Sequence, residues 1–183
     1  MTIAIHLPLR SADIVVRRLR HDDAEDFALG TEDAAVREYG HLPLSDYTPE
    51  IVRDQIDGVI AEGLADGSLA VLAIAERDSD RFLGSLVLFD FREDRAEVGF
   101  WLAKTARGRG AAAKALDAAA ALAAKTGLDL LEARTSPQNT ASRRVLETAG
   151  FRQRGGVSEQ RTPSGSVVPV LTFERPVAAS REG

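Results

Sequence analysis

Residues 104–114, which read KTARGRGAAAK, limit the possible folds of this chain more than any other segment. They follow an apolar run that ends near Ala103 and lead into a segment rich in alanine and leucine, which favours a long helix. The first turn of a helix has backbone N–H groups without internal partners, and the helix dipole makes this end positive. Glycine lets the backbone approach a ligand closely, and arginine adds charged donors. The segment is therefore typical of a loop that holds an anion such as pyrophosphate.

Three other loop types fit these residues less well. A Walker loop ends in Gly-Lys-Ser/Thr, whereas Gly110 is followed by Ala111 and Ala112. A dinucleotide-binding glycine loop follows the first strand of a parallel βαβ unit, whereas this loop follows three apolar runs that predict an antiparallel meander. An RGG-type RNA-binding segment would form a longer repeat. A solvated lead-in to a helix stays open as the structural alternative.

Apolar periodicity and turn residues predict alternating strands and helices with no internal repeat. One helix is expected to have Thr48 as its N-cap and Pro49 in its first turn, and to end at Gly67. The expected strands are 14–16, 68–76, 81–91, 95–103 and 128–136, with two more before residue 176. The other helices are expected to begin after His21, near residue 110 and at Asn139.

Length and composition bound the class of protein. The 183 residues, 44% of them hydrophobic, fit one domain, 1–183, with a core from about 14 to 175 and a flexible tail at 176–183. A net charge of −5 argues against a general nucleic-acid binder. The absence of cysteine excludes thiolate metal sites and a cysteine acyl-enzyme, and the three separated histidines do not predict a metal site. Because no segment resembles a signal peptide or a membrane span, a cytoplasmic protein without membrane contact is expected.

Two motifs resemble those of a known family. Arg107, Gly110 and Ala112 fit the Gln/Arg-x-x-Gly-x-Gly/Ala signature of the GNAT superfamily of acetyl-coenzyme A-dependent N-acetyltransferases. The segment NTASRRVLETAGF, which begins at Asn139, resembles the Asn-x-x-Ser-x-x-x-Leu-Glu-x-x-Gly-Phe box of the RimJ/RimL-type subgroup. IVVRRLRHDDAEDF and AEVGFWL are similar to that subgroup's opening elements and fourth strand, so the resemblance runs from about residue 14 to 173.

The resemblance implies an α/β (α+β) GNAT fold: a mixed, mostly antiparallel seven-stranded sheet, splayed between its fourth and fifth strands and flanked by about four helices. It implies that the pantetheine arm of acetyl-coenzyme A (acetyl-CoA) enters the splay, beside backbone groups that extend the sheet edge. The cofactor-binding residues it implies are Trp101, Leu102, Ala103, Arg107, Gly108, Arg109, Gly110, Ala111, Ala112, Asn139 and Ser142.

The implied chemistry is direct attack of a neutral amine on the thioester, which needs a polarised carbonyl, a proton acceptor and a proton donor. A backbone N–H near Leu102 is the expected oxyanion donor. Glu97 is the expected base, directly or through water; its structural alternative is a surface carboxylate on a half-buried strand. Many relatives carry a tyrosine acid seven residues after the asparagine, where this chain has Leu146, so Ser142 is expected to protonate the thiolate, with Asn139 beside it.

The acceptor site is expected between the first two helices and the last hairpin. Tyr39, His41 and Tyr47 are the candidate substrate-binding residues, and each could equally be a structural loop residue. A protein N-terminus and a small amine or antibiotic both stay open as acceptors, as do a monomer and a homodimer. A non-catalytic domain that senses acyl-CoA is the alternative from a different class, because both motifs report cofactor binding only.

Overall fold

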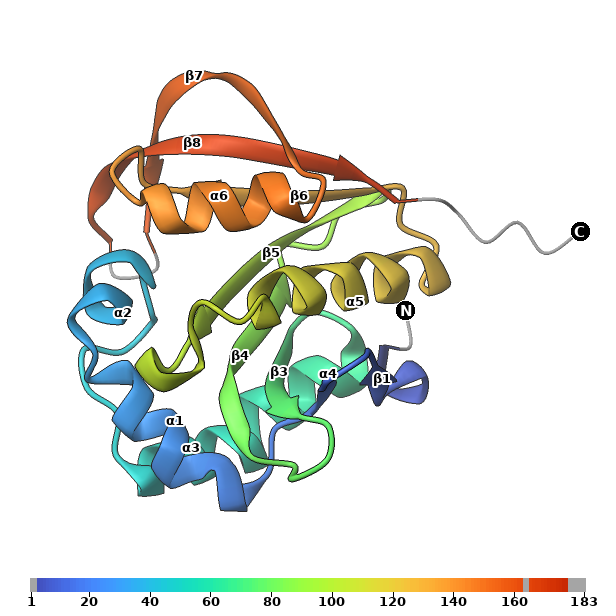
Figure 1. Ribbon diagram of the computed structural model, residues 1–183, viewed down its shortest axis with the longest axis vertical. Coiled ribbons are helices and arrows are strands. Elements are labelled where there is room, and N and C mark those ends of the chain that lie inside the picture. Colours follow the sequence, from blue (N-terminus) through green and yellow to red (C-terminus); the bar gives the residue numbers. More distant parts are fainter. Residues whose placement is uncertain (1–2, 163–164, 178–183) are drawn as a thin grey trace, which may run out of the picture.

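The computed structural model describes residues 3–162 and 165–177, which form one mixed sheet flanked by helices (Figure 1). The predicted tail at 176–183 falls almost wholly outside the described residues. The strands are β1 Leu9–Arg10, β2 Ile14–Arg18, β3 Ala70–Glu76, β4 Phe82–Phe89, β5 Arg95–Leu102, β6 Leu130–Thr135, β7 Arg152–Arg161 and β8 Val167–Pro176. The α-helices are α1 Ala24–Thr31, α2 Ala34–Tyr39, α3 Pro49–Gln55, α4 Ala61–Asp66, α5 Ala111–Lys125 and α6 Thr140–Thr148.

Within the described residues the sheet has eight strands in the order β1-β2-β3-β4-β5-β6-β8-β7, and every neighbouring pair except β5–β6 is antiparallel. The predicted mixed, mostly antiparallel sheet is therefore confirmed, but the predicted count of seven strands was one too low. The additional strand is β1, whose two residues pair with Val15 and Val16. Two residues are too few to show the alternation by which a strand is recognised in sequence.

The splay lies between β5 and β6, which are the fourth and fifth strands predicted from the sequence. These strands pair over only three positions, which are Arg95 with Leu130, Ala96 with Leu131 and Glu97 with Glu132. Figure 1 shows the two strands together at one end and diverging toward the side where α2 lies. Beyond Glu97, β5 continues to Leu102 without a partner on its β6 side.

The helices differ from the prediction in two places. The helix predicted from 49 to 67 is broken into α3, a π-helical turn at Ile56–Ile60 and α4, because Gly58 leaves helical geometry with φ −102° and ψ −109°. The short helix α2 was not predicted from the sequence. It begins after Asp33, whose side chain accepts hydrogen bonds from Ala35 N and Val36 N and so satisfies two N–H groups of the first turn. The described residues therefore contain six α-helices rather than about four.

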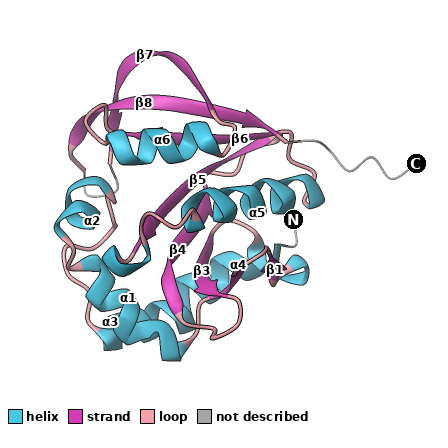
Figure 2. Cartoon of the chain, in the orientation of Figure 1, coloured by secondary structure: helices cyan, strands magenta, loops and turns pink. Residues whose placement is uncertain are grey.

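Helices lie over both faces of the sheet (Figure 2), and the two faces bury different residues. α5 and α6 cover one face, where fully buried alanines of α5 such as Ala115 and Ala119 allow the helix to approach the strands closely. α1 and α3 pack on the other face around Trp101, whose ring lies 5.2 Å from that of Phe27. Gly30 of α1 contacts this indole so closely that a Cβ would lie 2.4 Å from it. The core under α1 and α3, which we call the α1-face core, therefore reaches β5 next to the splay.

Candidate active site

The pairing of β5 with β4 decides which backbone groups of β5 face the splay. Ala103 N donates to Leu83 O at 2.8 Å, so the backbone of Ala103 points to β4. Hydrogen-bonded positions alternate along an antiparallel pair, which directs the backbone of Trp101 to β4 and those of Phe100 and Leu102 to the β6 side. Of the three residues predicted to bind pantetheine, Leu102 alone presents its backbone to the splay. Phe100 also presents its backbone to the splay and was not among the predicted residues. The sequence does not reveal which alternate residues of a strand form hydrogen bonds to one neighbour and which face the other.

The start of α5 has the geometry of an anion site. Gly108 and Gly110 both have φ +77°, a left-handed conformation that side chains rarely adopt. Gly110 is the N-cap of α5 and has no side chain to cap it, so the N–H groups of the first turn have no capping partner. This loop, residues 107–112, therefore directs uncapped donors and the positive end of a 15-residue helix outward.

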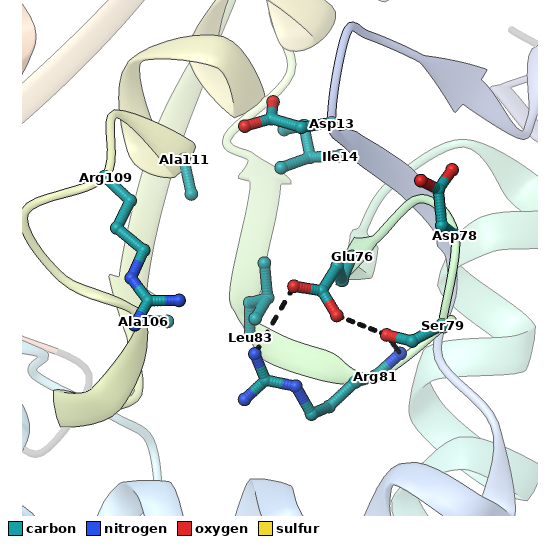
Figure 3. A pocket seen from close by; sticks show the side chains of 10 residues that line it. All are labelled: Asp13, Ile14, Glu76, Asp78, Ser79, Arg81, Leu83, Ala106, Arg109 and Ala111. Atoms are coloured by element: carbon teal, nitrogen blue, oxygen red, sulfur yellow. Dashed lines mark hydrogen bonds and ion pairs between the residues drawn. The ribbon is translucent and has the colours of Figure 1, made fainter.

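The two arginines of this loop do not point the same way. Arg107 turns back to β5, where its Nε and Nη2 donate to Leu102 O at 3.1 Å and 3.0 Å, and its Nη2 also contacts Asp33 Oδ1 at 2.7 Å. Arg109 lies at the edge of a surface pocket of about 350 Å³ that also contains Glu76 and Arg81 of the β3–β4 hairpin (Figure 3). The Arg107 guanidinium is thus engaged by Leu102 O and Asp33 rather than turned toward the start of α5.

The start of α6 contrasts with that of α5 because it is capped by its own side chain. Asn139 Oδ1 accepts a hydrogen bond from Ser142 N at 3.0 Å. The Ser142 hydroxyl is half-buried and has no hydrogen-bond partner in the described part of the chain. Leu146, at the position where many relatives carry tyrosine, is 1% exposed and belongs to the core. No described residue thus engages the Ser142 hydroxyl, and its role as proton donor stays a prediction.

Glu97 lies at the last position where β5 pairs with β6, and the two strands separate beyond it. Its side chain shares a face of the strand with Trp101, whereas Val98 packs on the α5 face, which agrees with the predicted alternation. Glu97 is 7% exposed, so the alternative of a surface carboxylate is wrong. The pKa of Glu97 is raised from 4.5 to about 6, mainly because the carboxylate is buried; the charges of Asp90 and Glu132 contribute to this rise, and the charge of Arg134 opposes it.

A cluster of charged residues surrounds Glu97, and we call it the apex cluster. Arg134 of β6 contacts Glu97 directly, with 2.5 Å between Nη1 and Oε2. Glu132 is 8% exposed and lies opposite Glu97 across the strand pair. The cluster consists of Asp90, Arg92, Arg95, Glu97, Glu132 and Arg134. Sequence alternation could have placed Glu132 and Arg134 on one face of their strand, but not next to Glu97.

The predicted acceptor residues lie at the end of α2 and in the segment that follows it. Tyr39 ends α2, and His41 is half-buried, which lowers the pKa of its imidazole. Tyr47 packs against Phe27 with 5.8 Å between ring centroids, and burial raises the pKa of its phenol. Tyr47 is thus part of the α1-face core, which favours its structural interpretation. No hydrogen bond or ion pair between described residues joins these three side chains to Glu97.

Residues 3–162 and 165–177 contain no group of three or more His, Cys, Asp or Glu side chains placed to hold a metal ion. Within the same ranges, no helix combines the length and the apolar character that a membrane span requires.

Comparison with known proteins places this geometry in context. Residues 13–152 match the family model described as an acetyltransferase (GNAT) domain. An uncharacterized N-acetyltransferase, p20, from Bacillus licheniformis is 24% identical over 164 residues, which cover 87% of this chain and 90% of that protein.

Two solved structures share the fold. RimJ of Mycobacterium smegmatis, in complex with a CoA disulfide, superposes with a TM-score of 0.76 at 20% identity, covering 93% of this chain and 85% of that one. An acetyltransferase of Salmonella typhimurium, which modifies the N-terminal serine of ribosomal protein L7/L12, has a TM-score of 0.75 at 18% identity, covering 92% and 97%.

Proposed function

This chain belongs to the GNAT family of acetyltransferases, and we propose that it transfers the acetyl group of acetyl-CoA directly to a primary amine, the N-terminal amine of a protein. The observation that carries this proposal is the position of Glu97, a buried carboxylate with a pKa of about 6 at the point where β5 and β6 separate. A base whose pKa lies near the working pH is suited to proton transfer.

The residues around the splay fit acetyl-CoA. The uncapped start of α5 offers N–H groups to the pyrophosphate, and the backbone of Phe100 and Leu102 offers an edge along which the pantetheine amides can pair. Arg107 supports this edge through Leu102 O. Asn139 and Ser142 approach from the start of α6.

Each proton has an assigned residue. Acetyl-CoA supplies a thioester whose carbonyl carbon forms the new C–N bond as its C–S bond breaks. Glu97 accepts the proton that the amine loses, either directly or through one water. A backbone N–H of β5 near Leu102 stabilises the carbonyl oxygen. Ser142 donates a proton to the sulfur that leaves, because Leu146 has no proton to give.

The protein N-terminus is favoured as acceptor by the relatives. The Salmonella protein named above modifies the N-terminal serine of a ribosomal protein, and its fold matches over nearly the whole of both chains. A cytoplasmic location and a monomeric or homodimeric state stay predictions from the sequence.

The test is the release of free CoA by the purified protein from acetyl-CoA, with a panel of N-terminal peptides, lysine side-chain peptides and small amines. We expect turnover with N-terminal peptides and no turnover when the same peptides are blocked at their N-terminus. Turnover with small amines alone would contradict the assigned acceptor. Tight binding of acetyl-CoA without turnover on any amine would instead favour an acyl-CoA sensor.

A further inference from the structure

Asp33 connects the start of α2 to the end of β5. Its Oδ1 accepts hydrogen bonds from Ala35 N at 3.1 Å and Val36 N at 3.2 Å, and the same atom contacts Arg107 Nη2 at 2.7 Å. The Arg107 guanidinium lowers the pKa of Asp33, which keeps the carboxylate charged. The guanidinium also donates twice to Leu102 O. One ion pair therefore joins the helix before the acceptor segment to the strand edge that faces the splay.

α2 needs such an anchor. A helix of six residues is too short to be stable alone, so its position depends on tertiary contacts. Val36, 4% exposed, is its one buried residue and packs on the α1-face core. Asp33 supplies the second point of attachment. Tyr39 is the last residue of α2 and His41 lies two residues beyond it, so any movement of α2 displaces both relative to β5.

We propose that Asp33 is a positioning residue for the acceptor: its ion pair with Arg107 holds α2, and with it Tyr39 and His41, at the open end of the splay. The inference rests on the proposed function, because it assumes that an amine acceptor binds beside this segment. It also assigns the Arg107 side chain to the acceptor side, although the sequence motif had assigned this residue to the pyrophosphate.

The ion pair is placed to set position more than stability. The side chain of Asp33 is 19% exposed and that of Arg107 is 38% exposed, and partly solvated pairs contribute little to folding. The family signature allows Gln at the Arg107 position, and a Gln amide keeps a donor for Leu102 O while losing the charge that attracts Asp33. Arg107→Gln is therefore expected to spare the cofactor and weaken only the link to α2.

The first experiment compares Asp33→Ser with the wild-type chain in steady-state kinetics on an N-terminal peptide and in calorimetry with acetyl-CoA. Serine keeps an oxygen for the N-cap but is too short to hold Arg107 as well. We expect the KM for the peptide to rise about three- to fivefold, which is the effect of losing one partly exposed ion pair. We expect kcat and the acetyl-CoA Kd to stay within about twofold of wild type.

Two further variants sharpen the result. Arg107→Gln should raise the peptide KM by the same factor, and the double variant should add nothing, because both changes break one link. Asp117→Ser is the matched control, since it breaks the exposed ion pair with Arg175 on the far side of α5 and should change neither constant. An unchanged peptide KM in Asp33→Ser, or an equal loss of acetyl-CoA affinity, would overturn the proposal.

Hydrogen exchange gives a readout that does not depend on turnover. Amides of Ala34–Tyr39 should exchange faster in Asp33→Ser than in wild type, while those of α5 stay protected. If the wild-type chain acetylates no amine, the proposed function fails, and exchange at α2 still decides whether the ion pair anchors this helix. Equal protection of α2 in the two proteins would overturn the anchoring role.

Discussion

The loop at 107–112 and the apex cluster lie at opposite ends of the stretch of β5 that has separated from β6. The two sites are built in different ways. The loop depends on backbone conformation: two glycines with φ +77° and a helix start without a capping side chain. The apex depends on side chains, with a carboxylate that is 7% exposed and an arginine 2.5 Å from it. Binding and proton transfer can therefore be disturbed separately.

The difference has a physical reason. A bound phosphate needs several N–H donors aimed at one point, which a glycine-rich turn provides without any particular side chain. A base needs one group whose pKa lies near the working pH, and this requires burial together with neighbouring charges. Substitutions at the apex are thus expected to change turnover, and substitutions of the loop glycines to change the affinity for acetyl-CoA.

The largest effect is expected at Glu97. Glu97→Gln removes the proton acceptor, so turnover should fall about 10²- to 10⁴-fold while acetyl-CoA affinity stays near wild type. In the wild type, the rate should fall as the pH decreases through about 6, because the carboxylate must be deprotonated to act as a base. The variant should lack this acidic limb of the pH–rate profile.

A matched change separates this role from a general effect of charge. Glu174→Gln removes a carboxylate of β8 that pairs with Arg154, and it should leave turnover unchanged. Normal turnover with an unaltered pH profile in Glu97→Gln would show that Glu97 serves only as the partner of Arg134.

An intermediate effect is expected in the loop. Gly110→Ala puts an L residue into a left-handed conformation, which costs roughly 1–2 kcal/mol and should shift the first N–H groups of α5. We expect acetyl-CoA affinity to fall about tenfold, equal to about 1.4 kcal/mol, in calorimetry. The nearest protein atom to an added Cβ is Lys114 Cε at 3.9 Å, so backbone strain is the cause within the protein.

The control for this change lies at the other end of the same helix. Gly127 also has a left-handed φ, +82°, and open space around an added Cβ. Gly127→Ala should therefore destabilise the fold by a similar amount without affecting acetyl-CoA binding. Equal acetyl-CoA affinities for Gly110→Ala and Gly127→Ala would show that the loop at 107–112 does not bind the cofactor.

The smallest effect is expected at Arg134. Its charge lowers the pKa of Glu97 against burial and against the charges of Asp90 and Glu132. Arg134→Gln should raise that pKa, so less Glu97 is deprotonated at pH 7 and turnover there should fall by roughly two- to tenfold, recovering at higher pH. The midpoint of the acidic limb should move to higher pH.

Arg154→Gln tests whether this shift is local. Arg154 pairs with Glu174 and is not among the main causes of the Glu97 pKa shift, so its loss should leave the acidic limb in place. If the midpoint of the acidic limb of the pH–rate profile stays near pH 6 in Arg134→Gln, or moves to lower pH, Arg134 does not lower the pKa of Glu97.

Much of the frame could be predicted from sequence because it rests on local preferences. The strands on both sides of the splay, the long alanine-rich helix and the cap at Asn139 follow from periodicity, propensity and capping chemistry, whereas the splay itself was implied by the family resemblance. α2 escaped prediction because six residues carry too little periodicity, and its capping residue Asp33 directly follows another acidic residue, Glu32.

The sequence by itself determined where the backbone has to take an unusual conformation, since glycine at 108 and 110 expresses a local steric rule. The tertiary structure alone decided which charges meet. Arg134 lies 37 positions from Glu97, and Asp33 lies 74 positions from Arg107, in segments whose approach depends on strand register and helix packing. Such contacts arise from the sum of many weak interactions across the fold, so no local pattern encodes them.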